Sequence, residues 1–343
     1  MAVAVGIDAG TSSFEIFVLE DDNPLLKRTF LTSEVKKKTE IVLKALKEIN
    51  PDVIAGPSGY GLPVKRFSEL SNSDIALMTL NFDRTVMGVR SLIDLIRKSE
   101  LGEITWTIPG IIHLPTIPEY RKLNRIDMGT SDKLCSVALA VYQFARGGMP
   151  FDEQNFVLVE AGYGFNAFIA VKSGKVVDGI GGTSGFPAFS SLGSLDGELA
   201  YLLGDFPKSM LFSGGIRSLL KDKGIKVDRL EDLPNFAVEW MCEFILKGIR
   251  AVSVSLDEFE VVVSGRFFDL FYEEFKEYSG IKAVKLGGFG IAKQSAEGAA
   301  IIASGLAGGR FKDIVDWLEI QKAKGSVFDY VTSDIRRYLR KSD

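Results

Sequence analysis

Residues 3–20 read VAVGIDAGTSSFEIFVLE, and this stretch decides the fold. One apolar strand ends at Asp8, and a second begins at Phe14. The turn between them is rich in glycine and hydroxyl side chains, namely Gly10, Thr11, Ser12 and Ser13. Glycine lets the backbone approach a phosphate closely, and successive turn N–H groups can surround an anion. The pattern therefore predicts a β-hairpin whose turn binds phosphate, with the hydroxyl groups as further donors.

A second unit of the same kind starts about 150 residues later. Its strands cover 156–160, 165–171 and 175–180, and its turn contains Gly162 and Gly164. One such unit alone could equally be an ordinary hairpin with a small-residue turn, because short glycine motifs have many false positives. Two units, one in each half of the chain, favour two similar domains that hold one phosphate chain from opposite sides.

The acidic residue at the first turn indicates the cofactors. Asp8 is suited to hold a hydrated Mg²⁺ beside phosphates, so we expect ATP and Mg²⁺ with Asp8 as the metal-binding residue. His113 is the only histidine, and its apolar neighbours favour a packed side chain over a catalytic base. Cys135 and Cys242 lie far apart in apolar helical stretches, so we interpret them as buried thiols in a reducing compartment.

The composition is that of a globular chain with two domains. The 343 residues exceed what one hydrophobic core usually serves, so we expect a division near the middle. A content of 46% hydrophobic and 25% charged residues leaves ample material for the cores. The net charge of −4 is unlike that of proteins that bind nucleic acid through basic residues. No apolar run reaches the length of a membrane span. We expect a cytoplasmic protein without nucleic-acid or membrane partners, and a homodimer as the commonest assembly.

Strands and helices alternate along the chain. Besides the two hairpin units, we expect strands at 26–31, 52–55, 260–263 and 282–286 and helices at 33–49, 82–98, 131–146, 235–255 and 292–306. Residues 147–150, Gly-Gly-Met-Pro, mark a boundary between domains 1–148 and 149–343, with the last helix able to pack back on the first domain. This order predicts an α/β fold with mixed sheets flanked by helices.

The ordered motifs resemble those of the superfamily of acetate and sugar kinases, heat-shock chaperones and actin (ASKHA). Residues 5–13 and 158–164 are similar to its two phosphate motifs. Residues 261–266 resemble its adenosine-contacting turn, and residues 295–305 resemble the small-residue helix packed behind that turn. The resemblance covers essentially the whole chain. It implies two ribonuclease-H-like domains around an ATP cleft.

Within that superfamily, the chain looks most like the acetate and butyrate kinase branch, and like an archaeal family labelled predicted butyrate kinase. Residues 114–132 parallel an acetate kinase stretch that ends Phe-His-Gly-Thr-Ser-His. The two histidines of that motif fall on Met128 and Asp132, and Glu160 replaces a further histidine. The arginine-bearing loop of acetate kinases falls near 192–196, which contains no arginine.

In acetate kinases, the histidines and the arginine that this chain lacks offset negative charge on the transferred phosphoryl group. Such charge stabilisation usually lowers the activation free energy considerably. Three explanations stay open: other cations replace them, the acceptor differs, or phosphoryl transfer has been lost. Arg125 is our candidate replacement, because a guanidinium can hold two phosphate oxygens in a planar fork. Asp127 could orient an acceptor hydroxyl or take its proton, or it could be a structural residue at the entry to a helix.

The resulting site prediction has three parts. The expected catalytic residues are Asp8, Arg125 and Asp127. The expected nucleotide-binding residues are Gly10, Thr11, Ser12, Ser13, Glu160, Gly162, Gly164, Gly265, Arg266, Gly287 and Gly288. The expected acceptor-binding residues are Ser58, Lys65, Arg66, Thr130, Thr183 and Ser184. Any one of the basic residues could instead be a charge that solvates a loop.

These residues predict an ATP-dependent phosphotransferase that acts on a small carboxylate, as a butyrate kinase does, or on a hydroxyl acceptor. The alternative from another class is a nucleotide-dependent switch or ATPase like actin and the chaperones. A third hypothesis is the ATPase that activates 2-hydroxyacyl-CoA dehydratases. That activator needs cysteines that share an iron–sulfur cluster across a dimer, and the positions of Cys135 and Cys242 in apolar helices disfavour it.

Overall fold

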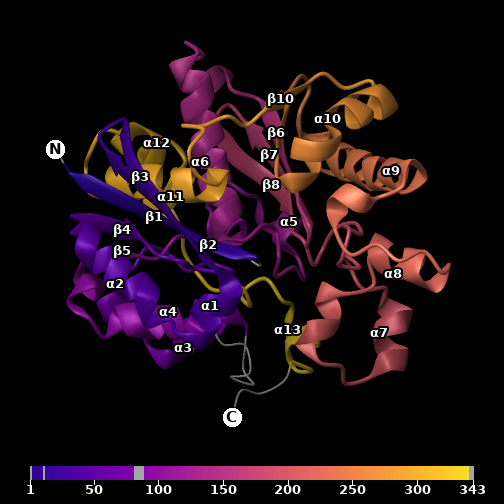
Figure 1. The fold of residues 1–343 in the computed structure, drawn as a ribbon, viewed down its shortest axis with the longest axis horizontal. Helices are drawn as coiled ribbons and strands as arrows, with labels where there is room; N and C mark the ends of the chain where they lie inside the picture. Colours follow the sequence, from indigo (N-terminus) through magenta and orange to yellow (C-terminus); the bar gives the residue numbers. More distant parts are fainter. Residues whose placement is uncertain (1, 11, 81–88, 340–343) are drawn as a thin grey trace.

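The computed structural model describes residues 2–10, 12–80 and 89–339. They form two five-stranded sheets with the same topology (Figure 1). The first sheet has the order β3-β2-β1-β4-β5, from β1 (Val3–Ala9), β2 (Ser13–Glu20), β3 (Asn23–Leu31), β4 (Val53–Ala55) and β5 (Thr105–Trp106). The second has the order β10-β9-β6-β7-β8, from β6 (Phe156–Ala161), β7 (Asn166–Lys172), β8 (Lys175–Ile180), β9 (Glu260–Ser264) and β10 (Ala283–Lys285). The predicted α/β fold with two mixed sheets is confirmed.

Each sheet begins with an antiparallel meander and continues with parallel strands. β1 pairs antiparallel with β2 and parallel with β4, and β6 pairs antiparallel with β7 and parallel with β9. Ala9 lies opposite Phe14 in the first hairpin, and Ala161 lies opposite Asn166 in the second. The two glycine turns therefore occupy equivalent places, at the carboxyl end of each central strand, where ligands collect in open α/β sheets.

Helices cover both faces of both sheets. The bounds of the α-helices are α1 Thr32–Lys37, α2 Glu40–Ile49, α3 Asn72–Thr79, α4 Val89–Arg97, α5 Glu119–Lys122, α6 Ser131–Arg146, α7 Gly197–Leu203, α8 Ile216–Asp222, α9 Asn235–Val252, α10 Arg266–Ser279, α11 Gln294–Leu306, α12 Lys312–Trp317 and α13 Ser333–Arg336. Short 3-10 helices span Phe67–Glu69, Glu100–Glu103, Ile111–His113, Phe151–Glu153, Lys208–Phe212, Leu230–Asp232, Ser253–Ser255 and Ile320–Lys322. None of the described helices is long and apolar enough to cross a membrane.

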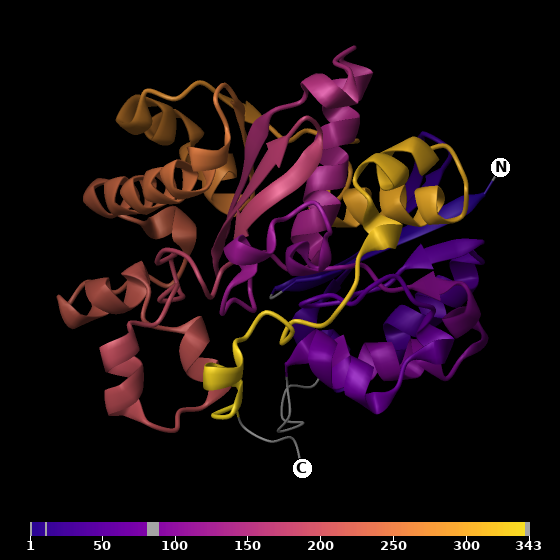
Figure 2. The ribbon, with the colours of Figure 1, turned by 180° about the vertical axis from the view of Figure 1, so that it is seen from behind.

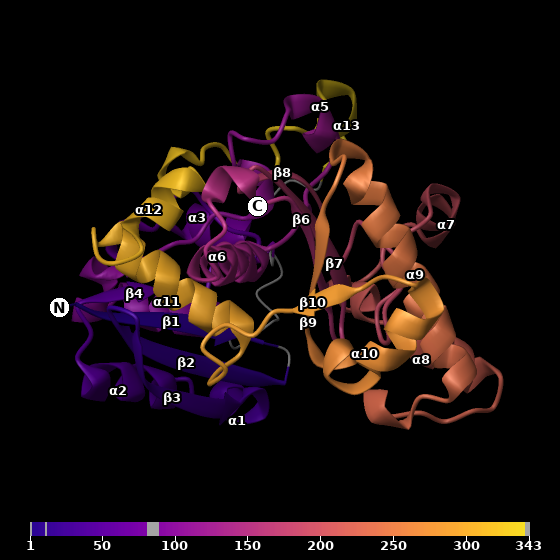
Figure 3. The ribbon, with the colours of Figure 1, turned by 90° about the horizontal axis from the view of Figure 1, so that it is seen from above.

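Side-chain alternation sorts these helices into layers. Val5 and Ile7 of β1 face a core shared with α2 and α4 on the outside of the first sheet. Val157 and Val159 of β6 face a core shared with α9 and α10 on the outside of the second sheet. The opposite faces of both sheets share one core with α6 and α11, which lie between the sheets (Figure 3).

The chain exchanges elements between its two halves. α11 belongs to the second half of the sequence but packs on β1 and β2 of the first sheet. After α12 the chain runs back across the molecule, as the yellow segment in Figure 2 shows, and the N–H of Asn124 donates to the carbonyl of Tyr330 (2.9 Å). The predicted boundary near residue 148 stays a prediction.

Some predicted elements differ from the structure. The helix predicted over 33–49 is two helices, because the chain breaks at Lys38 and the hydroxyl of Thr39 donates to the carbonyl of Val35 (3.0 Å). The helix predicted over 82–98 is described only in part. Its residues 82–88 lie outside the described residues, and α4 covers the rest. The two-residue strand β5 was missed because so short a strand has no visible period.

Two glycines allow three layers to pack at unusually short distances. A Cβ atom at Gly6 of β1 would lie 2.1 Å from the carbonyl oxygen of Ala296 in α11. A Cβ atom at Gly298, also in α11, would lie 1.8 Å from the carbonyl oxygen of Cys135 in α6. Both obstacles are backbone atoms, so the contact of β1 with α11 and of α11 with α6 requires glycine.

We expect the substitution Gly298→Ala to lower the free energy of unfolding by about 3 kcal/mol, because the added methyl group forces α6 and α11 apart. Gly197→Ala is the matched control, since a Cβ atom there meets nothing within 4 Å. Thermal or denaturant unfolding measures both variants. Equal stability of the two would contradict the packing argument.

The single histidine lies in this core and offers a second measurement. His113 is 1% exposed, and burial lowers the pKa of its imidazole to about 4. Because the chain contains no other histidine, its imidazole proton resonances in an NMR titration are unambiguous. We expect a midpoint near 4. The unfolded chain then binds more protons than the folded chain between this value and about 6.5, so His113 makes stability fall as the pH falls through that window. A midpoint near 6.5 would show that His113 is solvated.

Candidate active site

The first glycine turn is tied to the helix that follows the meander. The N–H of Gly10 donates to the carbonyl of Ser13 (3.0 Å), and the hydroxyl of Thr32 donates to the carbonyl of Gly10 (2.9 Å). The N–H of Thr32 donates to the carbonyl of Ser12 (3.0 Å). Thr11, a predicted phosphate ligand, lies outside the described residues. The carboxylate of Asp8 lies beside this turn.

A lysine that the sequence analysis did not select occupies the first turn. The ammonium group of Lys293 lies 3.1 Å from Oδ2 of Asp8 and donates to the carbonyl of Ser13 (2.9 Å). A Cβ atom at Gly10 would lie 2.7 Å from the ammonium nitrogen. Burial raises the pKa of Asp8, the charge of Asp132 adds to the rise, and Lys293 opposes it.

The second glycine turn has open space over it. The N–H of Gly162 donates to the carbonyl of Phe165 (3.2 Å), which closes the hairpin. A Cβ atom at Gly162 or Gly164 would meet nothing within 4 Å, and neither residue has a positive φ. The hairpin itself therefore does not need glycine at these two positions. This room is what a bound group would require.

A partly buried ionic cluster joins the start of α6 to the end of β6. The ammonium group of Lys133 lies 2.5 Å from Oδ2 of Asp132 and 2.6 Å from Oε1 of Glu160. The hydroxyl of Ser136 donates to Glu160 (3.2 Å), and the hydroxyl of Thr130 donates to Asp132. Lys133 is thus paired with two carboxylates at once.

The electrostatics connect this cluster to the first turn. Burial raises the pKa of Glu160, and the charges of Asp132 and Asp8 add to the rise while Lys133 opposes it. Burial also acts to raise the pKa of Asp132, but the ion pair with Lys133 outweighs it and holds the pKa below its usual value. Burial alone would lower the pKa of Lys133, yet the two carboxylates raise it. Asp8, Asp132 and Glu160 therefore form one interacting group with two lysines.

Asp127, a predicted catalytic residue, ties two loops together. Its Oδ2 accepts hydrogen bonds from the N–H (2.9 Å) and the hydroxyl (2.8 Å) of Thr183, and its Oδ1 accepts one from the N–H of Gly129 (3.1 Å). The hydroxyl of Ser184 donates to the carbonyl of Asp127. The predicted residues Asp127, Thr183 and Ser184 are brought together, and the carboxylate already accepts three hydrogen bonds.

Arg125, the predicted transition-state cation, lies beside this loop contact. It lines a hollow of about 420 Å³ with the loop residues Leu123, Asn124, Ile126, Asp127, Thr183, Ser184 and Ser194. The charge of Arg125 acts on Asp178. Burial raises the pKa of Asp178, and the charges of Arg121 and Arg125 partly oppose this rise. After burial, the strongest influences on the pKa values of Asp8 and Glu160 are the charges of Lys293 and Lys133, and not that of Arg125. The role of Arg125 stays a prediction.

The residues predicted for adenosine lie on well-supported loops. Gly265 ends β9 with φ +96°, and a Cβ atom there would lie 2.4 Å from the carbonyl of Ala161. The N–H groups of Gly287 and Gly288 donate to Oε1 of Gln143 (2.8 and 3.3 Å). Arg266 has an exposed side chain with one long ion pair to Glu231 (4.0 Å).

Glu297 supports the same loop and was missed by the sequence analysis. It is fully buried, and its carboxylate accepts hydrogen bonds from the N–H groups of Phe289, Ile291 and Ala292 (2.8, 2.8 and 2.9 Å). A Cβ atom at Gly288 would lie 2.2 Å from Oε2 of Glu297. A lone acidic residue in a helix of small residues was the available signal, because a buried carboxylate needs several donors.

Ser58, Lys65 and Arg66, the predicted acceptor residues of the first half, have local partners. The hydroxyl of Ser58 bonds to the carbonyl of Gly56 (3.0 Å) and the N–H of Ile108 (2.9 Å). Lys65 pairs with Asp74 (3.0 Å), and Arg66 pairs with Glu103 (3.5 Å). The structure thus assigns each of them a structural contact, and their predicted contact with an acceptor stays untested.

Lys208, in the second half of the chain, contacts the backbone of the first half. Its ammonium group donates to the carbonyls of Thr79 (2.8 Å) and Leu80 (3.0 Å), and it lies 5.2 Å from the centre of the Tyr60 ring. Burial lowers the pKa of Lys208 to about 8, and Asp127 opposes this shift. The contact holds the segment after α7 against the end of α3.

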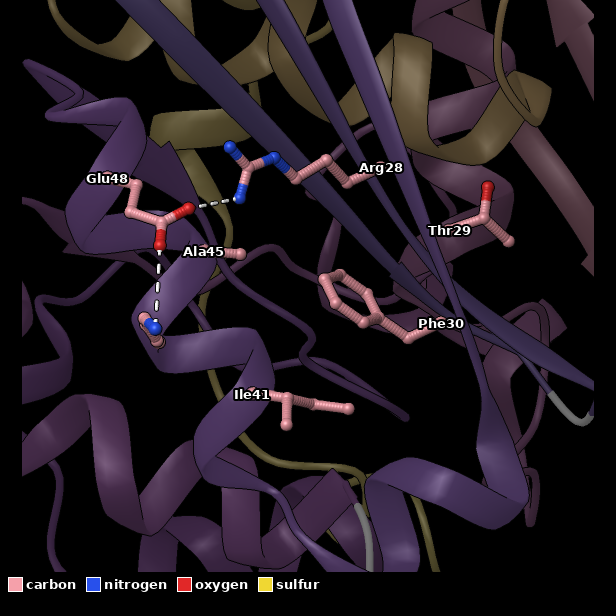
Figure 4. Close-up of a pocket in the computed structure, with 7 residues that line it drawn as sticks. Arg28, Thr29, Phe30, Ile41, Ala45 and Glu48 are labelled. Carbon is pink, nitrogen blue, oxygen red and sulfur yellow. Dashed lines mark hydrogen bonds and ion pairs between the residues drawn. The ribbon is translucent and has the colours of Figure 1, made fainter.

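Another hollow lies away from these residues, on the outer face of the first sheet (Figure 4). Arg28, Phe30 and Ile41 line it, and Arg28 pairs with Glu48 (2.6 Å). No predicted site residue borders it. Among the described residues, no three His, Cys, Asp or Glu side chains are close enough together to hold a metal ion without other ligands.

Solved structures share this architecture. An acetate kinase from Entamoeba histolytica has a TM-score of 0.56 and 11% identity, over 81% of this chain and 85% of that chain. A propionate kinase from Francisella tularensis subsp. tularensis SCHU S4 has a TM-score of 0.56 and 14% identity, over 88% of this chain and 98% of that chain. An acetate kinase from Porphyromonas gingivalis has a TM-score of 0.53 and 15% identity, over 77% and 83%. These likenesses confirm the predicted two-sheet kinase-like fold, and the predicted place in the acetate and butyrate kinase branch stays a prediction.

Sequence comparison gives a family but no activity. No curated protein sequence matches this chain. A family model described as "Protein of unknown function (DUF1464)" matches residues 6–333, which is nearly the whole chain. The protein therefore belongs to the DUF1464 family.

Proposed function

We propose that this protein is an ATP-dependent phosphotransferase that phosphorylates a small carboxylate, as a butyrate kinase does, or a hydroxyl acceptor. The observation that carries the proposal is the pair of glycine turns at equivalent strand ends, with the ionic cluster of Asp8, Asp132, Lys133, Glu160 and Lys293 between them. The open space over Gly162 and Gly164 supports it, because the hairpin itself does not need glycine there.

The residues of the first turn fit a nucleotide-borne Mg²⁺. The carboxylate of Asp8 and the carbonyl of Ser13 are oxygen ligands of the kind that Mg²⁺ prefers, and this ion usually keeps several waters and binds through few protein groups. Mg²⁺ supplies charge that offsets the triphosphate and polarises the transferred phosphoryl group. Asp8 would hold the ion through its carboxylate.

The protein's own part in the transfer is positioning and charge stabilisation. An oxygen of the acceptor forms a bond to the γ-phosphorus, and the bond from that phosphorus to the oxygen bridging to the β-phosphate breaks. ADP leaves with the electron pair. In each turn, the N–H groups that are not bonded within the hairpin hold phosphate oxygens, and closure of the two halves excludes water.

The hydrogen bonds of Asp127 favour a carboxylate as the acceptor. A hydroxyl acceptor must lose a proton to a base, whereas a carboxylate attacks as an anion and needs none. The carboxylate of Asp127 already accepts hydrogen bonds from Thr183 and Gly129, so both of its oxygens are used in the contact between two loops. Phosphorylation of a carboxylate yields an acyl phosphate and ADP.

A nucleotide-dependent switch is the second candidate, and the contact of Lys208 favours it. This contact joins the second half of the chain to the carbonyls of Thr79 and Leu80 in the first half. A change in the angle between the halves would make or break it. Nucleotide binding at the same site would then control the angle between the halves, without phosphoryl transfer to an acceptor.

Trapping with hydroxylamine tests the proposed reaction directly. We expect hydroxamate to form from acetate, propionate or butyrate only when the protein, Mg²⁺ and ATP are all present, because hydroxylamine intercepts an acyl phosphate. Colorimetric detection of hydroxamate and coupled detection of ADP are the two measurements. ADP release that does not respond to any carboxylate or hydroxyl acceptor would instead support the switch.

Substitution of a glycine in the second turn tests nucleotide binding. We expect Gly164→Leu to weaken Mg·ATP binding by about tenfold to 100-fold, because the side chain blocks hydrogen bonds to the phosphates. We expect the free energy of unfolding without ligand to change by less than about 0.5 kcal/mol. Gly197→Leu is the matched control, since that glycine also has open space around it. Calorimetry and thermal unfolding measure both variants. Unchanged affinity would remove the second turn from the site.

A further inference from the structure

We propose that Lys293 is an exchangeable counter-ion: its ammonium group pairs with Asp8 when no nucleotide is bound, and it transfers to the phosphate chain when Mg·ATP binds. This inference rests on the proposed function and names the cation that replaces the missing histidines and arginine. The geometry that points to it lies in the first turn.

The ammonium group occupies a site made of oxygen ligands. A carboxylate oxygen of Asp8 lies at 3.1 Å and the carbonyl oxygen of Ser13 at 2.9 Å. An ammonium group has three donors, so one donor is left for a further acceptor. Glycine at position 10 leaves room for this group, because a Cβ atom there would lie 2.7 Å from the ammonium nitrogen and 2.9 Å from the carbonyl oxygen of Ser13. The turn thus has room for a cation.

The backbone of Lys293 is fixed while its ammonium end can move. The N–H of Lys293 donates to Oε2 of the buried Glu15 (2.8 Å). Glu297 fixes the residues just before it through three backbone hydrogen bonds. The lysine side chain, in contrast, has four rotatable carbons and is 33% exposed. The ammonium group can therefore change partners without any rearrangement of the fold.

Of the two lysines in the cluster, only Lys293 is free to leave. Lys133 is held by Asp132 and Glu160 at 2.5 and 2.6 Å, and its side chain is 15% exposed. Lys293 has one carboxylate partner. When every group is ionised, the cluster holds one more carboxylate than ammonium groups. A divalent cation that arrived with the nucleotide would neutralise Asp8 and release Lys293 toward the phosphates.

The position of Lys293 in its helix supports a specific use of its charge. Lys293 is the N-cap residue of α11. The N-terminus of a helix carries partial positive charge, so a cation is disfavoured there and an anion is favoured. Asp8 and Glu15 offset this cost in the structure. A phosphate chain at the same place would interact favourably with both the lysine and the helix.

Divalent cations without nucleotide test whether Lys293 occupies the cation position. At pH 8, we expect Mg²⁺ or Mn²⁺ alone to leave the melting temperature of the wild-type protein almost unchanged. We expect Lys293→Met to show a rise of about 3 °C on addition of the same ion, because Asp8 is then free to bind it. Lys293→Arg, which keeps the charge, should behave like the wild type. The double variant Lys293→Met/Asp8→Asn should lose the rise.

Kinetics test the second half of the exchange. We expect Lys293→Met to lower kcat about 100-fold, as removal of one charge-stabilising group typically does, with a much smaller change in the KM for ATP. Lys312→Met is the control, because Lys312 also pairs with one aspartate but lies on the surface of α12. A Lys293→Met protein with the kcat of the wild type, or with no added response to the cation, would overturn the inference. Failure of the wild type to bind Mg·ATP would instead overturn the proposed function, and the cation comparison would still decide where Lys293 acts.

Discussion

The close contact of β1, α11 and α6 is the constraint on which the candidate site depends. Gly6 and Gly298 remove the side chains that would hold these three elements apart. Because they touch, the end of β1, the start of α11 and the start of α6 meet at one place between the sheets. Asp8, Lys293 and Lys133 come from these three ends, and Glu160 arrives from β6. A packing requirement in the core thereby sets the positions of the charges.

The pairing of these charges explains why a partly buried ionic cluster is tolerated. An isolated buried carboxylate is costly, and it is tolerated when it is paired and hydrogen-bonded. Asp132 and Glu160 share Lys133, whereas Asp8 has the partly exposed Lys293. Lys133 is thus the more constrained lysine, on the side of the second sheet. Lys293 is the less constrained lysine, at the first turn. A site that must accept and release a charged ligand needs such a difference in mobility.

Much of the fold was predictable because its signals are local. The period of the two hairpins, their glycine turns and the small-residue helix all lie within short stretches, and the antiparallel part of each sheet follows from them. The roles of Lys293, Glu297 and Lys208 depend on partners far along the chain, such as Asp8 and Thr79. No spacing rule connects such positions. A charge inside a helix of small residues was still a usable signal for Glu297, and a cation at a helix N-terminus was one for Lys293.

The two turns would hold a phosphate chain by different means. A Cβ atom at Gly162 or Gly164 would meet nothing within 4 Å, so the phosphates there would be held by N–H dipoles. At Gly10 the full charge of Lys293 would add to such dipoles. Hydrogen bonds to dipoles depend on the geometry of the phosphate oxygens, whereas attraction to a full charge rises with the charge of the ligand. Under the proposed function, the first turn is therefore the element that distinguishes a triphosphate from a diphosphate, and weakened attraction at this turn after transfer favours the release of ADP.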